Sequence, residues 1–351
     1  MMCALCLTLS QVSSVMPKKD LIIIGAGLSG LYAATLLHDR FNITILEARD
    51  RLGGRILTKD GHDLGPSWVW PHQSNILKLI RQYKLELFTQ YTEGDALYDT
   101  PGSVQRFQSP LSGPSARVAG GLQRLIEALA STLPSDMAHL NEEVTKISCS
   151  NENVRVETHH ASYYADYVIS TLPPRLACES IRYEPPLDEE VYRKMLQTPT
   201  WMGHTAKCVV EFQEAFWKDE GLSGFAFSHV GPLGEIHDAS TKDRAALFGF
   251  LHPKASAHNI ESHVKEQMKR LFADKYKLIT KVYCTDWKEE KFSSTKHDHA
   301  GLSEHPSYGL KLSHCDERLF FIGTETAYDN GGYLEGAVNS ALDIAKRLRD
   351  D

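Results

Sequence analysis

The chain of 351 residues lacks the features that mark membrane and nucleic-acid-binding proteins. No run approaches 18 apolar residues, which argues against an integral membrane segment. The net charge of −7 provides no basic field that would attract nucleic acid or anionic lipid. Residues 1–15 are apolar but have no basic start, so we interpret them as a lead-in before Met16 rather than as a secretory signal. These absences favour a cytoplasmic protein.

Cysteine is scattered and odd in number, with seven residues in the chain. Only Cys3 and Cys6 have C-x-x-C spacing, and no second pair follows them, so we expect neither a zinc site nor a redox motif. We expect all seven to be free thiols, as is usual in the cytosol. The length and the ordinary content of 42% hydrophobic and 24% charged residues predict two globular domains.

A strand–helix–strand unit opens the folded part of the chain. Leu21–Ile24 is apolar and mostly β-branched, Leu28–Arg40 has helical character, and Ile43–Leu46 is a second apolar strand that ends in Glu47. The turn 25–30 between strand and helix reads G-A-G-L-S-G. In this context the pattern predicts a dinucleotide site.

Each part of this unit has a chemical use in such a site. Gly25, Gly27 and Gly30 allow a tight turn, a close approach of pyrophosphate, and helix packing. The helix N-terminus around Ser29 offers free N–H groups and the positive end of its dipole. Glu47 lies about 20 residues after Gly27, where a carboxylate accepts hydrogen bonds from ribose hydroxyls.

The next residues favour FAD over a nicotinamide cofactor. Residues 47–55 read E-A-R-D-R-L-G-G-R and resemble the E-A-x-x-R-x-G-G-R run of FAD-dependent amine oxidases. Gly54 lets the backbone pass close to the cofactor, while Arg49, Arg51 and Arg55 are predicted to lie along it, the last two binding phosphate. A nicotinamide enzyme has no evident need for this second glycine pair.

Three later segments resemble the same group of flavoproteins. Residues 63–68 (D-L-G-P-S-W) resemble a stretch beside the flavin ring, which implies that Pro66, Ser67 and Trp68 contact it; Trp68 and Trp70 are equally explained as core aromatics. The strand at Lys207–Phe212 resembles one whose lysine reaches flavin N5 through a water. Residues 323–326 (G-T-E-T) and 331–337 (G-G-Y-L-E-G-A) resemble the segment that closes the flavin site, with Glu325, Tyr333 and Leu334 at the cofactor.

Together these segments identify the chain as similar to the flavin-containing monoamine oxidase family, in a short bacterial-type form. The resemblance implies an α/β fold, with a Rossmann-type, glutathione-reductase-like FAD domain and a second, α+β substrate domain. It implies oxidation of a small-molecule amine, with oxygen as electron acceptor, and a backbone contact of Val144 with adenine. The predicted FAD-domain segments are 17–75, 117–197 and 291–351, and the predicted substrate-domain segments are 76–116 and 198–290.

Two departures from mammalian relatives bear on the site. Their flavin-linking Cys-Tyr pair falls at Lys296 and His297, and no cysteine lies between Cys284 and Cys315, so FAD is expected to be non-covalent. The aromatic cage around the substrate amine would use Tyr333 and, as second wall, His297 or Tyr308. Lys207, Tyr333 and His297 are therefore the predicted catalytic residues.

Other interpretations remain open from the residues. His297, Asp298, His299 and His305 fall in a polar loop, and we predict no metal there. An L-amino-acid oxidase would need an arginine for the carboxylate, for which Arg106 and Arg117 are the nearest candidates. A desaturase or porphyrinogen-type oxidase would give Lys207 no role. A non-catalytic binding protein, as in the prenyl-GTPase escort group, would not need Glu47, Arg55, Glu325 and Tyr333.

Apolar spacing also predicts the remaining elements. We expect helices at 75–87, 122–133, 258–272 and 334–349, strands at 140–147, 154–158, 167–172 and 318–322, and alternating strands over 198–286. The polar, glycine-rich stretch 91–115 is short where the monoamine oxidases, by the resemblance, have a long helical insertion.

Overall fold

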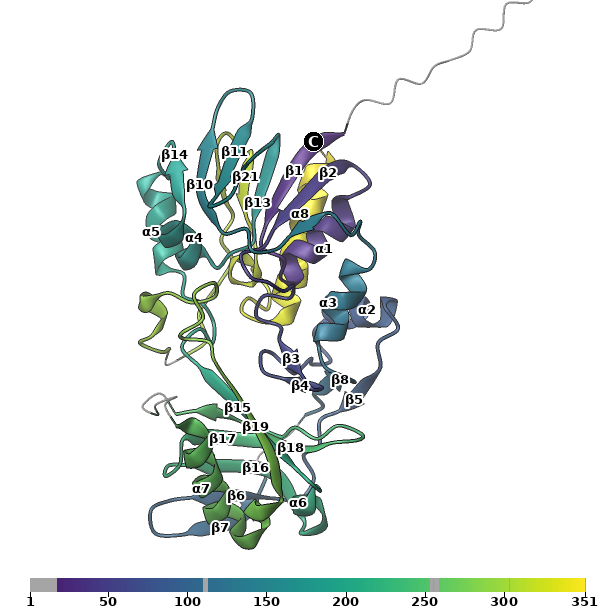
Figure 1. The fold of residues 1–351 in the computed structure, drawn as a ribbon, viewed down its shortest axis with the longest axis vertical. Coiled ribbons are helices and arrows are strands. Elements are labelled where there is room, and N and C mark those ends of the chain that lie inside the picture. The colour runs from purple at the N-terminus through teal and green to yellow at the C-terminus, as the bar shows by residue number, and fades with distance from the viewer. Residues whose placement is uncertain (1–17, 110–112, 253–254, 256–258, 303, 351) are drawn as a thin grey trace, which may run out of the picture.

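The computed structural model describes residues 18–109, 113–252, 255, 259–302 and 304–350. It consists of an upper and a lower body joined by several crossings of the chain (Figure 1). The predicted lead-in 1–15, with Cys3 and Cys6, lies outside the described residues.

The upper body is built on a six-stranded sheet in the order β20-β21-β13-β1-β2-β9. Its strands are β1 (Lys19–Ile24), β2 (Phe41–Leu46), β9 (Ala138–His139), β13 (Tyr167–Ser170), β20 (Leu312–His314) and β21 (Leu319–Phe321). β1 pairs in parallel with β2 and β13 at the centre, as the first βαβ unit predicts. Leu21 and Ile23 point to one face and Ile22 and Ile24 to the other, and all four are buried, because both faces of the sheet are covered.

Helices cover one face of this sheet and a second sheet covers the other. The helices are α1 (Leu28–Leu37), α2 (Ser74–Gln82), α3 (Gln123–Ala130) and α8 (Leu334–Asp350). The second sheet has the order β12-β11-β10-β14 and contains β10 (Val144–Cys149), β11 (Val154–Thr158), β12 (Ser162–Ala165) and β14 (Arg182–Glu184). In the chain, α4 (Pro174–Ser180) precedes β14 and α5 (Glu189–Gln197) follows it.

The lower body is a seven-stranded sheet in the order β19-β15-β18-β17-β16-β6-β7. Its strands are β6 (Asp95–Asp99), β7 (Val104–Gln108), β15 (Ala206–Phe212), β16 (Leu222–Ser228), β17 (Leu233–Asp238), β18 (Ala245–Leu251) and β19 (Ile279–Asp286). α6 (Phe216–Asp219) and α7 (Ile260–Phe272) pack on one face through a core that contains Trp217, Val264 and Met268. Part of the other face turns towards the upper body.

Short elements complete the chain. They are β3 (Thr58–Lys59), β4 (His62–Asp63), β5 (Leu87–Thr89), β8 (Ala116–Val118) and the 3-10 turns η1 (Ala273–Leu278), η2 (Lys296–Asp298) and η3 (Thr324–Thr326). Among the described residues, no helix has both the length and the apolar composition needed to cross a bilayer.

The structure adds detail to three sequence predictions. The short polar stretch 91–115 contains the hairpin β6–β7, whose strands pair at the edge of the lower sheet. The strand predicted at 140–147 begins at Val144, which leaves Glu142 and Glu143 in the preceding turn. The domain boundary predicted at residue 75 falls inside α2, whose buried residues Ile76, Leu79 and Ile80 belong to the core of the upper body.

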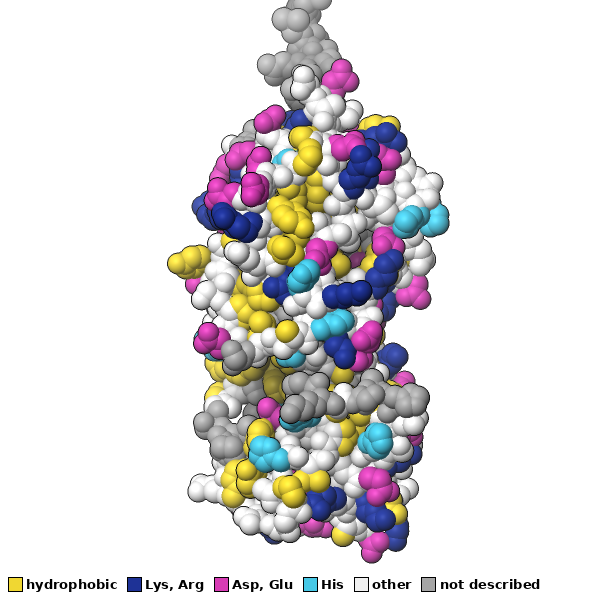
Figure 2. All heavy atoms as spheres, turned by 90° about the vertical axis from the view of Figure 1, so that its left-hand side faces the viewer, with side chains coloured by type: hydrophobic (Ala, Val, Ile, Leu, Met, Phe, Trp, Pro, Cys, Tyr) yellow, Lys and Arg dark blue, Asp and Glu magenta, His cyan; other side chains and the backbone are white. Residues whose placement is uncertain are grey.

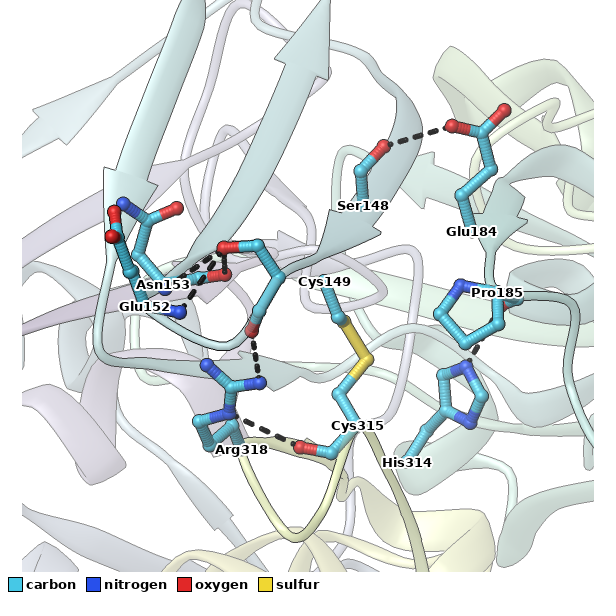
Figure 3. The surroundings of a disulfide bond; sticks show 10 residues. Ser148, Cys149, Glu152, Asn153, Glu184, Pro185, His314, Cys315 and Arg318 are labelled. Carbon is cyan, nitrogen blue, oxygen red and sulfur yellow. Dashed lines mark hydrogen bonds between the residues drawn. A yellow bond between two sulfur atoms is a disulfide. The ribbon is translucent and has the colours of Figure 1, made fainter.

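The expectation of free thiols is wrong for four cysteines. Cys149, at the end of β10, is bonded to Cys315 in the turn before β21 with a Cα–Cα distance of 5.9 Å (Figure 3). Arg318 donates to the carbonyl oxygens of Ser150 and Cys315, which further joins these two turns. Cys208 and Cys284 are bonded across β15 and β19, where they lie directly opposite each other. Cys178 is the free, buried cysteine of the described part of the chain.

Candidate functional site

A cavity of about 560 Å³ extends from the first glycine turn to the facing side of the lower sheet. Most residues predicted from the sequence line it. They are Gly25, Gly27, Ser29, Glu47, Arg49, Gly54, Arg55, Pro66, Ser67, Trp68, Val144, Lys207, Tyr333 and Leu334. Gly30, Arg51, His297 and Glu325 were also predicted and are not among the lining residues.

Glycine occupies three positions of the first turn for different structural reasons. Gly25 has a φ of +100°, a conformation that favours glycine. A Cβ on Gly30 would lie 2.0 Å from the carbonyl oxygen of Gly25, so glycine is needed there for packing. A Cβ on Gly27 would come no closer than 3.9 Å to surrounding protein atoms, and its φ of −77° is ordinary. The fold itself does not require glycine at 27, so the space beside it is available to a ligand.

A second glycine pair closes over the first turn. The N–H of Gly53 donates to the carbonyl oxygen of Ala26 at 2.8 Å, and a Cβ on Gly54 would lie 3.3 Å from the Cα of Gly27. Both glycines have positive φ, +105° and +59°. The two loops therefore form a side-chain-free surface next to the N-terminus of α1, which suits a pyrophosphate group.

Two carboxylates stand at the end of β2 and before β10. Glu47 is buried and accepts from the N–H groups of Ala26 at 2.8 Å and Arg49 at 2.9 Å. Arg49 in turn contacts Glu290 at 3.2 Å and Ser293 at 2.8 Å, so it links the turn to the last third of the chain. Glu142 lines the cavity and has a buried oxygen, Oε2, without a hydrogen-bond partner. An orphaned buried acceptor in this place fits the hydroxyl of a ribose.

The arginines of the 47–55 run divide into two kinds. Arg51 points away from the cavity, because its guanidinium donates to the carbonyl oxygens of Leu52, Gly54 and Ile56. The position of Arg51 therefore contradicts its prediction as a phosphate ligand: it shapes the loop. Arg55 lines the cavity and pairs with Glu325 at 2.6 and 2.8 Å. Glu325 itself does not line the cavity and lies behind Arg55.

Lys207 is a buried amine at the cavity wall. It is 2% exposed, and its Nζ donates to Ser67 Oγ at 2.6 Å and to the carbonyl oxygen of Gly65 at 3.0 Å. The ring of Phe248 lies 4.2 Å from Nζ. Burial lowers the pKa of Lys207 to about 7, while the nearby charge of Asp63 opposes and that of Arg117 reinforces this decrease. Lys207 can therefore hold or release a proton near neutral pH.

Aromatic rings form the wall at the Tyr333 end. Trp70 meets Tyr333 edge to face at 5.7 Å between ring centroids, and Trp201 lies at 6.5 Å. His305 stacks parallel on Tyr333 at 5.0 Å. The sequence reasoning missed Trp201 and Phe248, because a single aromatic residue outside a motif has the same signature as a core residue.

The structure does not place His297, the predicted second cage wall, at the cavity. Its side chain is 60% exposed and its Nδ1 lies 2.6 Å from Glu179, away from the cavity. The alternative, Tyr308, donates to the carbonyl oxygen of Pro199 at 2.8 Å and also lies outside the lining. The neighbouring Asp298 is buried and pairs with Arg175 at 2.6 Å, so it anchors the loop.

Comparison with known proteins agrees with this architecture. The sequence model described as flavin containing amine oxidoreductase matches residues 28–114 and 105–349. Flavin-containing amine oxidase B of Sus scrofa is 26% identical over 454 aligned positions, which cover 94% of this chain and 86% of that protein. Flavin-containing amine oxidase A of the same species is 25% identical, with 94% and 84% covered.

Solved structures of bacterial-type amine oxidases have the same fold. Cyclohexylamine oxidase from Brevibacterium oxydans has a TM-score of 0.80 at 19% identity, over 95% of this chain and 100% of the other. Putrescine oxidase bound to putrescine has a TM-score of 0.77 at 20% identity, over 95% and 100%.

The fold and the cavity thus define an FAD-dependent oxidoreductase with a Rossmann-type cofactor domain and a substrate domain. The chain belongs to the flavin containing amine oxidoreductase family, and amines are its substrate class. The family and fold predicted from the sequence are confirmed.

The buried amine predicts a specific pH dependence of stability. Below pH 7 both folded and unfolded chains carry a protonated Lys207, and the cost of burying the charge is fully present. Between pH 7 and 10.5, the ordinary pKa of lysine in the unfolded chain, Lys207 binds a proton in the unfolded chain but not in the folded protein. The free energy of unfolding therefore increases with pH over this range. Lys207→Met lacks this contribution.

Urea unfolding of the parent and of Lys207→Met, at equal FAD concentration, measures the effect. We expect the free energy of unfolding of the parent to increase relative to that of Lys207→Met from about pH 7 to about pH 10. A difference that stays constant over this range would show that Lys207 keeps an ordinary pKa.

Proposed function

We propose that the protein oxidises a small organic amine to an imine, which hydrolyses in water, and that oxygen then accepts the electrons to give hydrogen peroxide. Bound FAD would supply the redox chemistry by accepting a hydride from the carbon that carries the nitrogen. The observation that carries this proposal is the buried Lys207 amine at the cavity wall, held by Ser67 and Gly65.

The proposed roles of the cofactor residues follow from their chemistry. The Gly25–Gly30 turn, Ser29 and Gly54 offer backbone donors and space for the pyrophosphate. Glu47 and Glu142 offer carboxylate oxygens to ribose hydroxyls, and Val144 offers its backbone to adenine. Pro66, Ser67 and Trp68 would lie along the ring, and Leu334, at the start of α8, would bring the positive end of the helix dipole to it.

The remaining residues would act on substrate and water. The rings of Tyr333, Trp70 and Trp201 provide the electron-rich faces on which an amine can be oriented. Lys207 would hold a water in the cavity through a donated hydrogen bond. Arg55, with its partner Glu325, would keep positive charge at this end of the cavity.

The arrangement favours amine oxidation over amino-acid oxidation. Arg117 is buried with its guanidinium bound to the carbonyl oxygens of Asp238, Ala239 and Ser240. Arg106, on β7, donates to the carbonyl oxygen of Glu220. Neither arginine lines the main cavity, so neither is placed to hold a substrate carboxylate. A desaturase-type oxidase would leave the buried amine of Lys207 without a role.

We also propose that the cofactor domain is assembled from three chain segments and the substrate domain from two. The core of the upper body supports moving the first boundary from residue 75 to the end of α2 at Gln82. The two disulfide bonds argue against the cytoplasmic location expected from the sequence, because such bonds are rare in a reducing cytosol.

FAD is expected to be bound without a covalent link. No cysteine is among the described residues that line the cavity. Acid precipitation of the purified protein should leave the yellow colour in the supernatant. Colour retained in the washed pellet would contradict a non-covalent cofactor.

The proposed function is tested by peroxide release across a panel of amines, polyamines and amino acids, with Lys207→Met as the matched variant. This substitution keeps an unbranched, largely apolar side chain but removes the charge and the donors. Lys207→Met should bind FAD normally and lose roughly 100-fold or more in the rate of flavin reduction or reoxidation in rapid mixing. Parent rates in both half-reactions would remove Lys207 from the mechanism, and no flavin reduction by any amine in the parent would refute the function.

A further inference from the structure

One row of directly paired residues crosses six strands of the lower sheet. The register pairs Lys207 with Phe250, Phe250 with Glu235, Glu235 with Phe227, Phe227 with Tyr98, and Tyr98 with Gln105. Directly paired residues point to the same face of a sheet. The row therefore continues the face that carries Lys207, from β15 out to the edge strand β7.

This row leads from the cavity into solvent. Lys207 is buried, and Phe250 is half-buried and lines the cavity. The next side chains are open: Glu235 is 44% exposed, Phe227 39% and Tyr98 37%. The row thus runs from a side chain that lines the cavity to side chains that are exposed.

The outer part of the row is an aromatic shelf, formed by Tyr98, Phe107, Phe227 and His229. Tyr98 and Phe227 stack at 6.3 Å with an interplanar angle of 14°. Phe107 and His229 meet Tyr98 edge to face at 6.4 and 5.6 Å. Figure 2 shows hydrophobic side chains at the surface in the lower part of the molecule, where this sheet lies.

The alignment with a relative contains positions for which this chain has no residue. The alignment with amine oxidase B of Sus scrofa has 454 positions, whereas 94% of this chain is about 330 residues, so about 120 positions have no residue here. The family model matches in two parts that overlap at residues 105–114, a range that includes most of β7. The shelf is on the side of the sheet opposite α6 and α7, whose core contains Leu97 rather than Tyr98.

A carboxylate stands between the cavity and the shelf. Glu235 lies two strands from Lys207, which is about 10 Å at the usual strand spacing. One of its oxygens accepts from His237 Nε2 at 2.5 Å, and His237 is itself packed against Trp68, Phe225 and Phe248. This hydrogen bond lowers the pKa of Glu235, so the carboxylate is charged at neutral pH.

We propose that Glu235 and the aromatic shelf form a second, distal site for the far ammonium group of a long diamine or polyamine whose near amine is oxidised in the cavity. The inference rests on the proposed function and assigns its substrate class. A carboxylate flanked by aromatic faces is the surface that binds an organic ammonium ion, by charge and by cation–π contact. The alkyl chain between the two nitrogens would lie along Phe250.

The test compares octylamine with octamethylenediamine, which has the same carbon chain and a second amine. In the parent, kcat/KM for the diamine should exceed that for octylamine about tenfold or more, as one charge-assisted contact provides. Glu235→Gln should remove this preference by raising KM for the diamine, with kcat and all constants for octylamine unchanged. Glu266→Gln, an exposed glutamate of α7 on the opposite side of the sheet, should keep the preference.

The outcomes separate this site from its alternatives. If the parent oxidises both amines equally, or Glu235→Gln alters both alike, the distal site is wrong while the proposed function stands. If neither of the two amines reduces the flavin while another amine of the panel does, the distal site is wrong and the proposed function stands; if no amine reduces it, the proposed function fails and the distal site with it. If the shelf is instead a contact between two copies, Phe227→Ser should lower the mass in light scattering while the amine preference is insensitive to Glu235, which also overturns the proposal.

Discussion

The backbone contact between the two glycine loops is the constraint on which the cofactor site depends. The N–H of Gly53 reaches the carbonyl oxygen of Ala26, and Gly54 approaches Gly27 so closely that a Cβ on Gly54 would lie 3.3 Å from the Cα of Gly27. Glu47 holds the same turn from the other side through the N–H of Ala26. The contact leaves a bare surface at the start of α1 with its donors directed outward, and the negative groups of FAD have the complementary charge.

The other parts of the site are attached to this contact by charge. Arg55 follows Gly54 at once and pairs with Glu325, which brings the C-terminal segment to the same place. Arg49 does the same for Glu290. Segments far apart in the sequence thus meet because short polar links draw them to one turn. The lower sheet completes the enclosure by burying Lys207 against Ser67, so the glycine loops and Lys207 line a single cavity.

The parts of the site that are built from contiguous residues could be predicted from the sequence. The turn at 25–30, the carboxylate at Glu47 and the start of α8 are fixed by contiguous residues, and most of them line the cavity as expected. Arg51 and His297 failed because a charged residue in a motif has several possible partners, and only tertiary packing selects among them. Arg51 donates to a backbone carbonyl oxygen of its own loop, and His297 pairs with Glu179 at the surface.

Properties that arise from pairing distant strands had no local signal. Cys208 and Cys284 meet only through the register of β15 and β19, and Glu235 reaches the row of Lys207 only through β18. The hairpin β6–β7 is polar in sequence because only one of its faces is covered, and the same property leaves the aromatic shelf exposed.

Glycine at position 27 leaves space for the cofactor and is not needed for folding. Gly27→Ala tests it directly, because a Cβ there meets no protein atom closer than 3.9 Å and the backbone angles suit alanine. FAD affinity, measured by titration of flavin-free protein, should fall about tenfold or more, while the thermal midpoint of that flavin-free protein stays within a few degrees of the parent. Unchanged FAD affinity would contradict the account.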